Sequence, residues 1–215
     1  MKNINITSGE YLNNYLSKKN NEVFIPFNEA IIEGELLYPL FNENFIIKRS
    51  KVHNVKEELY KQKINDFINI KNYINEINEI TLWFGKDAFC IINLLTVLVY
   101  LEDNNYKGNI LLNLVDDYSN EVIKENIEIM IGEFKDIYIK LINRIQEMSN
   151  YTFINNGIKD YLYITSNDNH ILDYITENIN KISYADLLSN VLDLTYNYGL
   201  SDIQIEKMIN KIKIG

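Results

Sequence analysis

Residues 79–101 read EITLWFGKDAFCIINLLTVLVYL, and this stretch decides the fold. Residues 80–84 form a short run rich in β-branched and aromatic side chains, as in a buried strand. A polar Gly-Lys-Asp turn follows at residues 85–87, and the chain is then almost continuously apolar up to Leu101. The pattern predicts a buried strand, a tight turn and a buried helix.

Strand and helix signals also alternate on both sides of this stretch. Residues 3–7 and 22–27 (EVFIPF) read as strands, with a helical pattern between them, and residues 110–115 (ILLNLV) read as a fourth strand. Strands separated by helices pair in parallel in most folds. The sequence therefore predicts an α/β fold with a small, mostly parallel sheet of about four strands.

The rest of the chain reads as helical. Residues 35–77 form a helical insertion between the second and third strands. After residue 117 only helical patterns are recognised, at 121–131, 134–148, 158–165, 170–179, 184–196 and 202–212. We expect an α/β domain over residues 1–117 and a helical region over 118–215 that packs on it. Ser201 and Gln204 have the spacing of a capping box for the last helix.

Composition limits the class of protein. The chain has 215 residues, 47% of them hydrophobic, and one cysteine. A single cysteine, Cys90, excludes an internal disulfide and a Cys-based zinc site, and it suits a reducing cytoplasm. No secretory leader is recognised, and the apolar run at 88–101 is shorter than the roughly 20 residues that a membrane-spanning helix needs. We expect a cytoplasmic protein with no membrane association.

The charge balance counts against nucleic acid as a partner. Residues 1–117 carry 12 basic and 16 acidic side chains, and residues 118–215 carry 9 and 14. Non-specific binding depends on neutralising phosphates, so an acidic chain is a poor candidate. The helix–Gly–helix pattern at 184–212 has the form of a DNA-binding helix-turn-helix, but its only basic residues are Lys207 and Lys211, with Lys213 just after it. We therefore interpret it as a packed helix pair or a protein-contact surface.

Several polar residues follow the predicted strands. In open α/β sheets, ligands bind beyond the carboxyl ends of the strands. The residues at or near these ends are Ser8, Gly9, Glu10, Asn28, Glu29, Glu33, Lys86, Asp87, Asn113, Asp116 and Asp117. Two helix N-termini and the cations Lys86 and Arg49 favour an anion there. We therefore expect a small nucleotide-like or phosphorylated ligand, bound by Ser8, Gly9, Arg49, Lys86 and Asn93.

The carboxylates also suggest chemistry. Mg²⁺ binds through one or two carboxylates and the phosphates of a substrate, so Mg²⁺ is a candidate cofactor with Glu10, Asp87 and Asp116 as candidate ligands. Asp87, Glu10 and Glu33 are candidate catalytic residues for a hydrolase or transferase reaction. In the alternative interpretation, Glu10 and Asp87 are acids at helix N-termini.

Other polar residues are read more simply. A buried amide at Asn93 needs partners, which a neighbouring loop backbone provides. His53 and His170 stand in polar surroundings and are expected at the surface. The competing function is a non-enzymatic regulatory or protein-interaction module that uses the helical region to bind a partner.

Three segments resemble the DUF1835 family, a bacterial domain of unknown function. They are INITSGEYL at residues 4–12, the 27–34 segment with a following Arg49, and LWFGKDAFCIINLL at residues 82–95, where the resemblance is strongest. YGLSDIQ at 198–204 is similar to an element of longer members. Asn5, Ser8 and Glu10 stand where His, Asn and Asp are common. The resemblance implies no chemistry, but it implies that these turns form one site.

Overall fold

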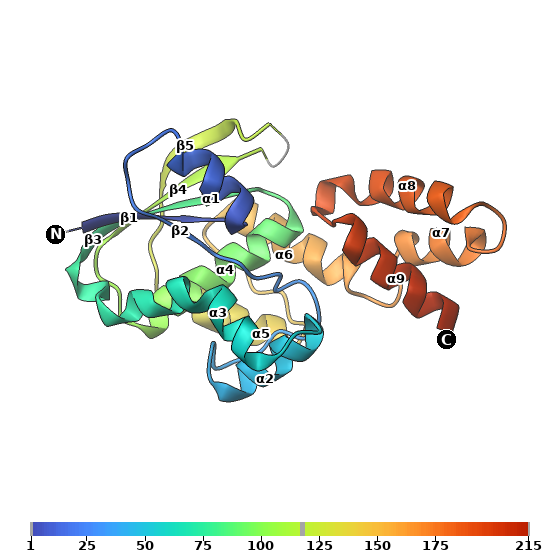
Figure 1. Ribbon diagram of the computed structural model, residues 1–215, viewed down its shortest axis with the longest axis horizontal. Helices are drawn as coiled ribbons and strands as arrows, with labels where there is room; N and C mark the ends of the chain where they lie inside the picture. Colours follow the sequence, from blue (N-terminus) through green and yellow to red (C-terminus); the bar gives the residue numbers. More distant parts are fainter. Residues whose placement is uncertain (1, 117–118, 215) are drawn as a thin grey trace.

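A computed structural model of the chain describes residues 2–116 and 119–214. Five strands form one sheet in the order β2-β1-β3-β4-β5 (Figure 1). They are β1 (Lys2–Thr7), β2 (Phe24–Pro26), β3 (Ile77–Phe84), β4 (Asn109–Val115) and β5 (Val122–Glu128). The first four are parallel, and β5 pairs antiparallel to β4. The α/β class is confirmed, but the sheet has five strands and not four.

The fifth strand replaces the helix that was expected at residues 121–131. The ends of β4 and β5 are joined by two backbone hydrogen bonds, both at 2.8 Å: the Asp116 N–H donates to the Glu121 carbonyl, and the Asn120 N–H donates to the Asp116 carbonyl. The backbone of β5 then satisfies the open edge of β4. Because β5 is exposed over nearly its whole length, it lacks the alternating apolar pattern that marks a strand in the sequence.

The two faces of the sheet are covered unequally. On one face, α1 (Gly9–Ser17) packs Leu12 and Leu16 against Val115, with Trp83 beside them. The opposite face carries apolar side chains such as Leu82 and lies under the remaining helices of the sheet domain (Figure 1). These helices are α2 (Glu43–Val52), α3 (Glu57–Ile68), α4 (Ala88–Asp103), α5 (Phe134–Ile142) and α6 (Thr152–Ile164).

The insertion between β2 and β3 is helical, as expected, but begins later. Residues 36–42 form no helix, and α2 starts at Glu43, where the Asn42 side chain caps it by accepting from the Phe45 N–H at 2.8 Å. Two short 3₁₀ turns, η1 (Asn69–Asn72) and η2 (Ile74–Glu76), lead from α3 into β3.

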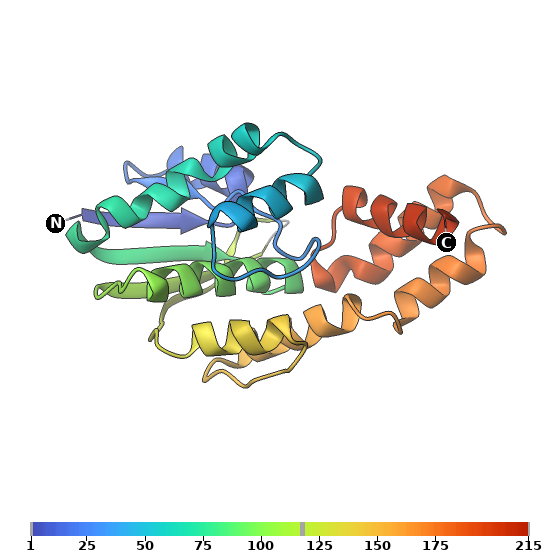
Figure 2. The ribbon, with the colours of Figure 1, turned by 90° about the horizontal axis from the view of Figure 1, so that it is seen from below.

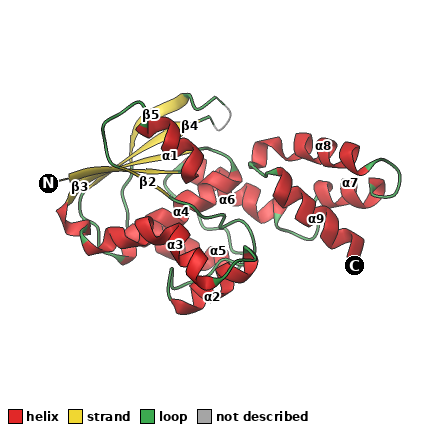
Figure 3. Cartoon of the chain, in the orientation of Figure 1, coloured by secondary structure: helices red, strands yellow, loops and turns green. Residues whose placement is uncertain are grey.

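The end of the chain is a separate group of helices, to which the name helical region is restricted from here on: α7 (His170–Asn178), α8 (Tyr184–Thr195), the 3₁₀ turn η3 (Tyr196–Tyr198) and α9 (Asp202–Ile214). The segment before it, with β5, α5 and α6, belongs to the sheet domain. This part contains only helices and loops (Figure 3). It lies beyond the end of the sheet toward which β1 points (Figure 2). At the start of α9, the Ser201 N–H donates to Gln204 Oε1 at 2.8 Å, as the capping box predicts. No helix within residues 2–116 and 119–214 is long and apolar enough to cross a membrane.

Candidate functional site

The turns that follow β1, β3 and β4 open onto one cavity of about 660 Å³. The strand that follows β1 in the chain, β2, lies on one side of β1, whereas the strand that follows β3, β4, lies on the other side of β3. The strand order therefore reverses between β1 and β3. Open α/β sheets have a ligand-binding crevice at this point. Four residues predicted for the site line it: Ser8, Lys86, Asp87 and Asp116. Asp117 lies outside the described residues.

Lys86 provides the positive charge of this cavity. It is exposed, and it has no hydrogen bond or ion pair with any residue of 2–116 or 119–214. It stands just before α4, whose N-terminus adds positive potential. The N-terminus of α1 opens onto the same cavity at Ser8. Two helix N-termini and an unpaired ammonium form an environment that favours an anion.

Ser8 and Gly9 shape the turn from β1 into α1. The Ser8 hydroxyl makes no capping hydrogen bond to α1 and lies 3.3 Å from the Cys90 sulfur. Gly9 has a φ of 84°, which a residue with a Cβ adopts only with strain. Gly9 therefore shapes the turn with its backbone, and Ser8 faces the cavity.

Asp87 has a structural role in the cavity wall. Its carboxylate accepts from the Cys90 N–H at 2.9 Å and caps α4. This is the role of an acid at a helix N-terminus, the alternative to a catalytic or metal-binding role for Asp87. Gly199 of the helical region packs against the same carboxylate, and a Cβ at position 199 would overlap it. Asp87 therefore joins the sheet to the helical region.

Asp116 closes the turn between β4 and β5. Its carboxylate accepts from the Ser119 N–H at 2.9 Å and from the Ser119 hydroxyl at 3.0 Å. It lines the cavity at the end of β4. The cavity thus has carboxylates from the ends of both β3 and β4.

The helical region completes the cavity. The lining residues from this region are Tyr196, Asn197, Gly199, Leu200 and Ser201. The sequence marks Gly199 as a helix end, and its φ of 72° agrees. No local pattern shows that this turn reaches the strand ends, because its contact is with Asp87, far away in the sequence.

Two predicted acids lie outside this cavity. Glu10 is exposed and accepts from the side-chain amides of Asn14 and Asn28, at 3.3 and 3.1 Å. Glu33 pairs with Lys207 at 2.5 Å and lines a different cavity. The carboxylates of Glu10, Glu33 and Asp87 are therefore not brought together.

Arg49 is buried within a cluster of charged and polar side chains. Its guanidinium pairs with Glu29 at 2.6 Å, and donates to the carbonyls of Ala30, at 2.7 Å, and Glu33. The Tyr60 hydroxyl donates to the other oxygen of Glu29. Arg49 thus holds the 29–33 segment in place and is not available to a ligand at the strand ends.

His53 belongs to this cluster and is half-buried, whereas an exposed position was expected. Its Nε2 lies 2.6 Å from Glu29 Oε1. Burial alone would raise the pKa of Glu29, but the hydrogen bond with His53, the charge of Arg49 and the bond from Tyr60 outweigh it and lower the pKa to about 2. Burial and the Glu29 carboxylate raise the pKa of Tyr60, which keeps its hydroxyl a donor.

Asn93 also holds the 29–33 segment. Its Oδ1 accepts from the Ile31 N–H at 3.1 Å, and its Nδ2 donates to the Glu29 carbonyl at 2.7 Å. The expected bond to a loop backbone is confirmed. Because Asn93 is buried and both ends of its amide are used, it does not line the cavity.

The described residues contain no preformed metal centre. In 2–116 and 119–214, no three or more His, Cys, Asp and Glu side chains are grouped so that they could hold an ion. A metal here would need ligand oxygens from a bound molecule in addition to Asp87 and Asp116.

Replacing Glu29 with Gln tests the buried cluster. The carboxyl pKa is about 2 in the folded protein and about 4.5 without the fold, so Glu29 stabilises the fold above pH 4.5 and this stabilisation is lost as the pH falls toward 2. Between pH 5 and 3.5, the stability advantage of wild type over Glu29→Gln should shrink by about 1 kcal/mol in urea denaturation. Glu58→Gln, at an exposed residue, is the control, and its stability relative to wild type should not change over this pH range. A stability difference between wild type and Glu29→Gln that does not vary with pH would contradict the cluster.

Replacing Gly199 with Ala tests the junction at Asp87. The left-handed backbone and the overlap with the carboxylate should lower the free energy of unfolding by about 1–3 kcal/mol, measured by urea denaturation. Asn197→Ala is the control, since it alters the same wall at an exposed residue without either effect. Equal stability of the two variants would show that Gly199 does not pack on Asp87.

Comparison of the chain with protein-family models, curated proteins and solved structures finds no match. Function must therefore be argued from the cavity itself, and the resemblance to the DUF1835 family stays a proposal.

Proposed function

We propose that the protein binds a small phosphorylated or nucleotide-like molecule, together with Mg²⁺, in the cavity at the carboxyl ends of β1, β3 and β4. One observation carries this proposal. Lys86, unpaired among the described residues, stands at the N-terminus of α4 in a cavity at the point where the strand order reverses. Topology and the positive potential at Lys86 and the start of α4 thus favour a bound phosphate at this place, provided that a cation balances the carboxylates of the lining.

The size and walls of the cavity suit a small organic anion. Sites for small molecules span about 300–1,000 Å³, and this cavity measures about 660 Å³. Tyr11 and Phe89 contribute aromatic surface, which suits the flat face of a base. Ser8, Asn197 and Ser201 contribute side chains able to hydrogen-bond a sugar or phosphate.

The carboxylates explain why Mg²⁺ is part of the proposal. The lining contains Lys86 together with the carboxylates of Asp87 and Asp116, so the charges of its described residues sum to a small negative value. A free anion would be repelled by the two carboxylates, whereas a magnesium complex would use them. Binding should therefore need both the anion and the cation.

Binding is better supported than catalysis. Of the catalytic candidates, only Asp87 lines the cavity, and it already caps α4, while Glu10 and Glu33 lie elsewhere. A general base must lie within hydrogen-bond reach of the proton that it removes. Hydrolysis or group transfer is thus a secondary proposal, with Asp116 as the remaining carboxylate of the lining.

We also propose membership in the DUF1835 family. The segments at 4–12, 82–95 and 198–204, which carry the resemblance, each contribute residues to this one cavity. The 27–34 segment does not line this cavity; Asn93 and Arg49 hold it in place, and its residues 32–34 line a different cavity. Segments distant in the sequence that meet at one cavity are consistent with a shared site.

The second candidate is a non-enzymatic interaction module built on the helical region. Its support is a set of apolar side chains of that region that are exposed to solvent, namely Leu194, Tyr196 and Ile203. Isolated exposed apolar residues are common on monomeric proteins, so this support is weaker than that of the cavity.

The proposal is tested with nucleoside mono-, di- and triphosphates, each with and without Mg²⁺. A bound ligand should raise the melting temperature by mass action. For the best ligand, Lys86→Ala should weaken binding by about tenfold or more in calorimetric titration, because a charge-assisted hydrogen bond is lost.

The matched control is Lys61→Ala, which removes an exposed lysine of α3 that lines neither cavity. Its affinity should equal that of wild type. The absence of any ligand-dependent shift, or equal affinity in the Lys86 and Lys61 variants, would overturn the proposal and favour the interaction module.

A further inference from the structure

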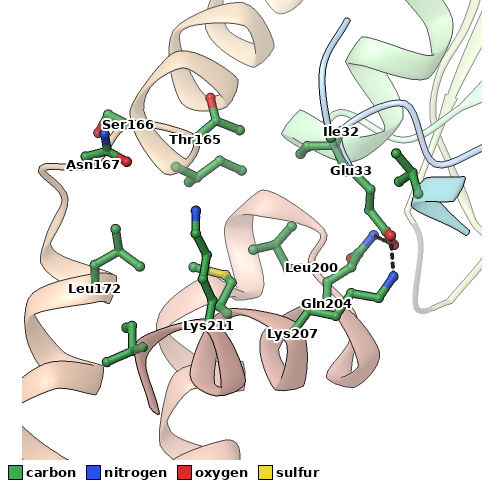
Figure 4. A pocket seen from close by; sticks show the side chains of 15 residues that line it. Ile32, Glu33, Thr165, Ser166, Asn167, Leu172, Leu200, Gln204, Lys207 and Lys211 are labelled. Atoms are coloured by element: carbon green, nitrogen blue, oxygen red, sulfur yellow. Dashed lines mark hydrogen bonds and ion pairs between the residues drawn. The ribbon is translucent and has the colours of Figure 1, made fainter. Parts of the chain in front are cut away.

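A second cavity, of about 580 Å³, lies between the sheet domain and the helical region. The 32–34 segment, the end of α6 and helix α9 surround it (Figure 4). Most of its wall is apolar and includes Ile32, Val52, Ile164, Leu172, Leu200 and Met208. Such a wall favours a ligand with an apolar body.

The negative charge of this lining is already neutralised. Glu33 accepts from Lys207 Nζ at 2.5 Å and from Gln204 Nε2 at 3.1 Å, and these bonds cross the cavity rim from the 32–34 segment to α9 (Figure 4). Because Lys207 and Glu33 offset each other, neither supplies net charge to a ligand.

Lys211 and Asn167 are in a different position. Neither side chain has a hydrogen bond or ion pair with a residue in the described part of the chain, 2–116 and 119–214. Lys211 extends from α9 toward the end of α6, on the side where Asn167 also lies (Figure 4). Both are exposed and can donate hydrogen bonds, so the lining of an apolar cavity contains an uncompensated positive charge and, on the same side, an amide.

The dipole of α9 favours a lysine in the last turn whichever way its side chain points, so it does not explain why the Lys211 side chain lines the cavity. Lys213, in the same turn, has its ammonium 4.7 Å from the centre of the Tyr184 ring. Lys211 instead lines an apolar cavity with its charge unpaired, in a chain whose net charge is −9.

We propose that this cavity is a second binding site, for a small amphipathic carboxylate. The apolar chain of the ligand lies among Ile32, Leu200 and Met208, and its carboxylate meets the Lys211 ammonium and the Asn167 amide. A single unpaired ammonium matches one negative charge, and the apolar wall disfavours a polyphosphate. The site does not depend on the ligand proposed for the strand ends, although Leu200 lines both cavities.

The test uses octanoate as the probe and 1-octanol as its uncharged counterpart, each titrated calorimetrically into the full chain. Wild type should bind one octanoate per chain, more tightly than octanol. Lys211→Ala should weaken octanoate binding by about fivefold, the effect of one partly exposed ion pair, and leave octanol binding unchanged.

Two controls locate the site. Lys213→Ala removes the same charge from the same helix without altering the lining, and Lys86→Ala alters only the strand-end cavity. Both should bind octanoate as wild type does. The proposal is overturned if octanoate does not saturate, if octanol binds equally well, if Lys211→Ala binds like Lys213→Ala, or if Lys86→Ala is the variant that loses octanoate.

Discussion

The structure depends on the burial of α4 on every side. Residues 90–101 of this helix, and Ala88 before them, are all buried. A helix that is apolar all round needs cover from more than one layer. The sheet provides one layer, and α5 and α6 provide the other, with Gly157 of α6 so close to Ile91 that a Cβ there would overlap its side chain. At the N-terminus of α4, the capping residue Asp87 contacts Gly199 of the helical region.

The same burial determines the path of the chain after β2. Asn93 is a polar residue in the middle of α4, and a buried amide must be paired. It pairs with the backbone of the 29–31 segment, which brings Glu29 into the interior. A buried carboxylate is costly unless charged and polar groups surround it, and Arg49, His53 and Tyr60 do so. Glu33 is carried with this segment to the surface of α9, which is why it lies outside the strand-end cavity.

Local patterns in the sequence predicted most of the fold. The runs at 80–84 and 88–101, and the strands before and after them, follow from apolar periodicity, which reflects burial directly. The fifth strand was missed because β5 is exposed and is held by backbone pairing with β4, which leaves no mark on the side-chain pattern. The last helices were predicted well because Gly199 and the Ser201 cap are local signals.

The candidate site was predictable only where topology decides it. Ser8, Lys86 and Asp116 follow neighbouring strands, so their common location follows from the sheet order. Arg49 and His53 were misread because their partner Glu29 belongs to another element, and pairing across elements has no local signature. The contact of Gly199 with Asp87 is of the same kind.

The segment from η3 to the start of α9 contributes lining residues to both cavities. Leu200 lines each of them, with Gly199 against Asp87 on one side and Gln204 bonded to Glu33 on the other. Leu200 is thus flanked by two contacts of the helical region with the sheet domain. Because Leu200 belongs to both linings, a ligand in either cavity would contact the same side chain.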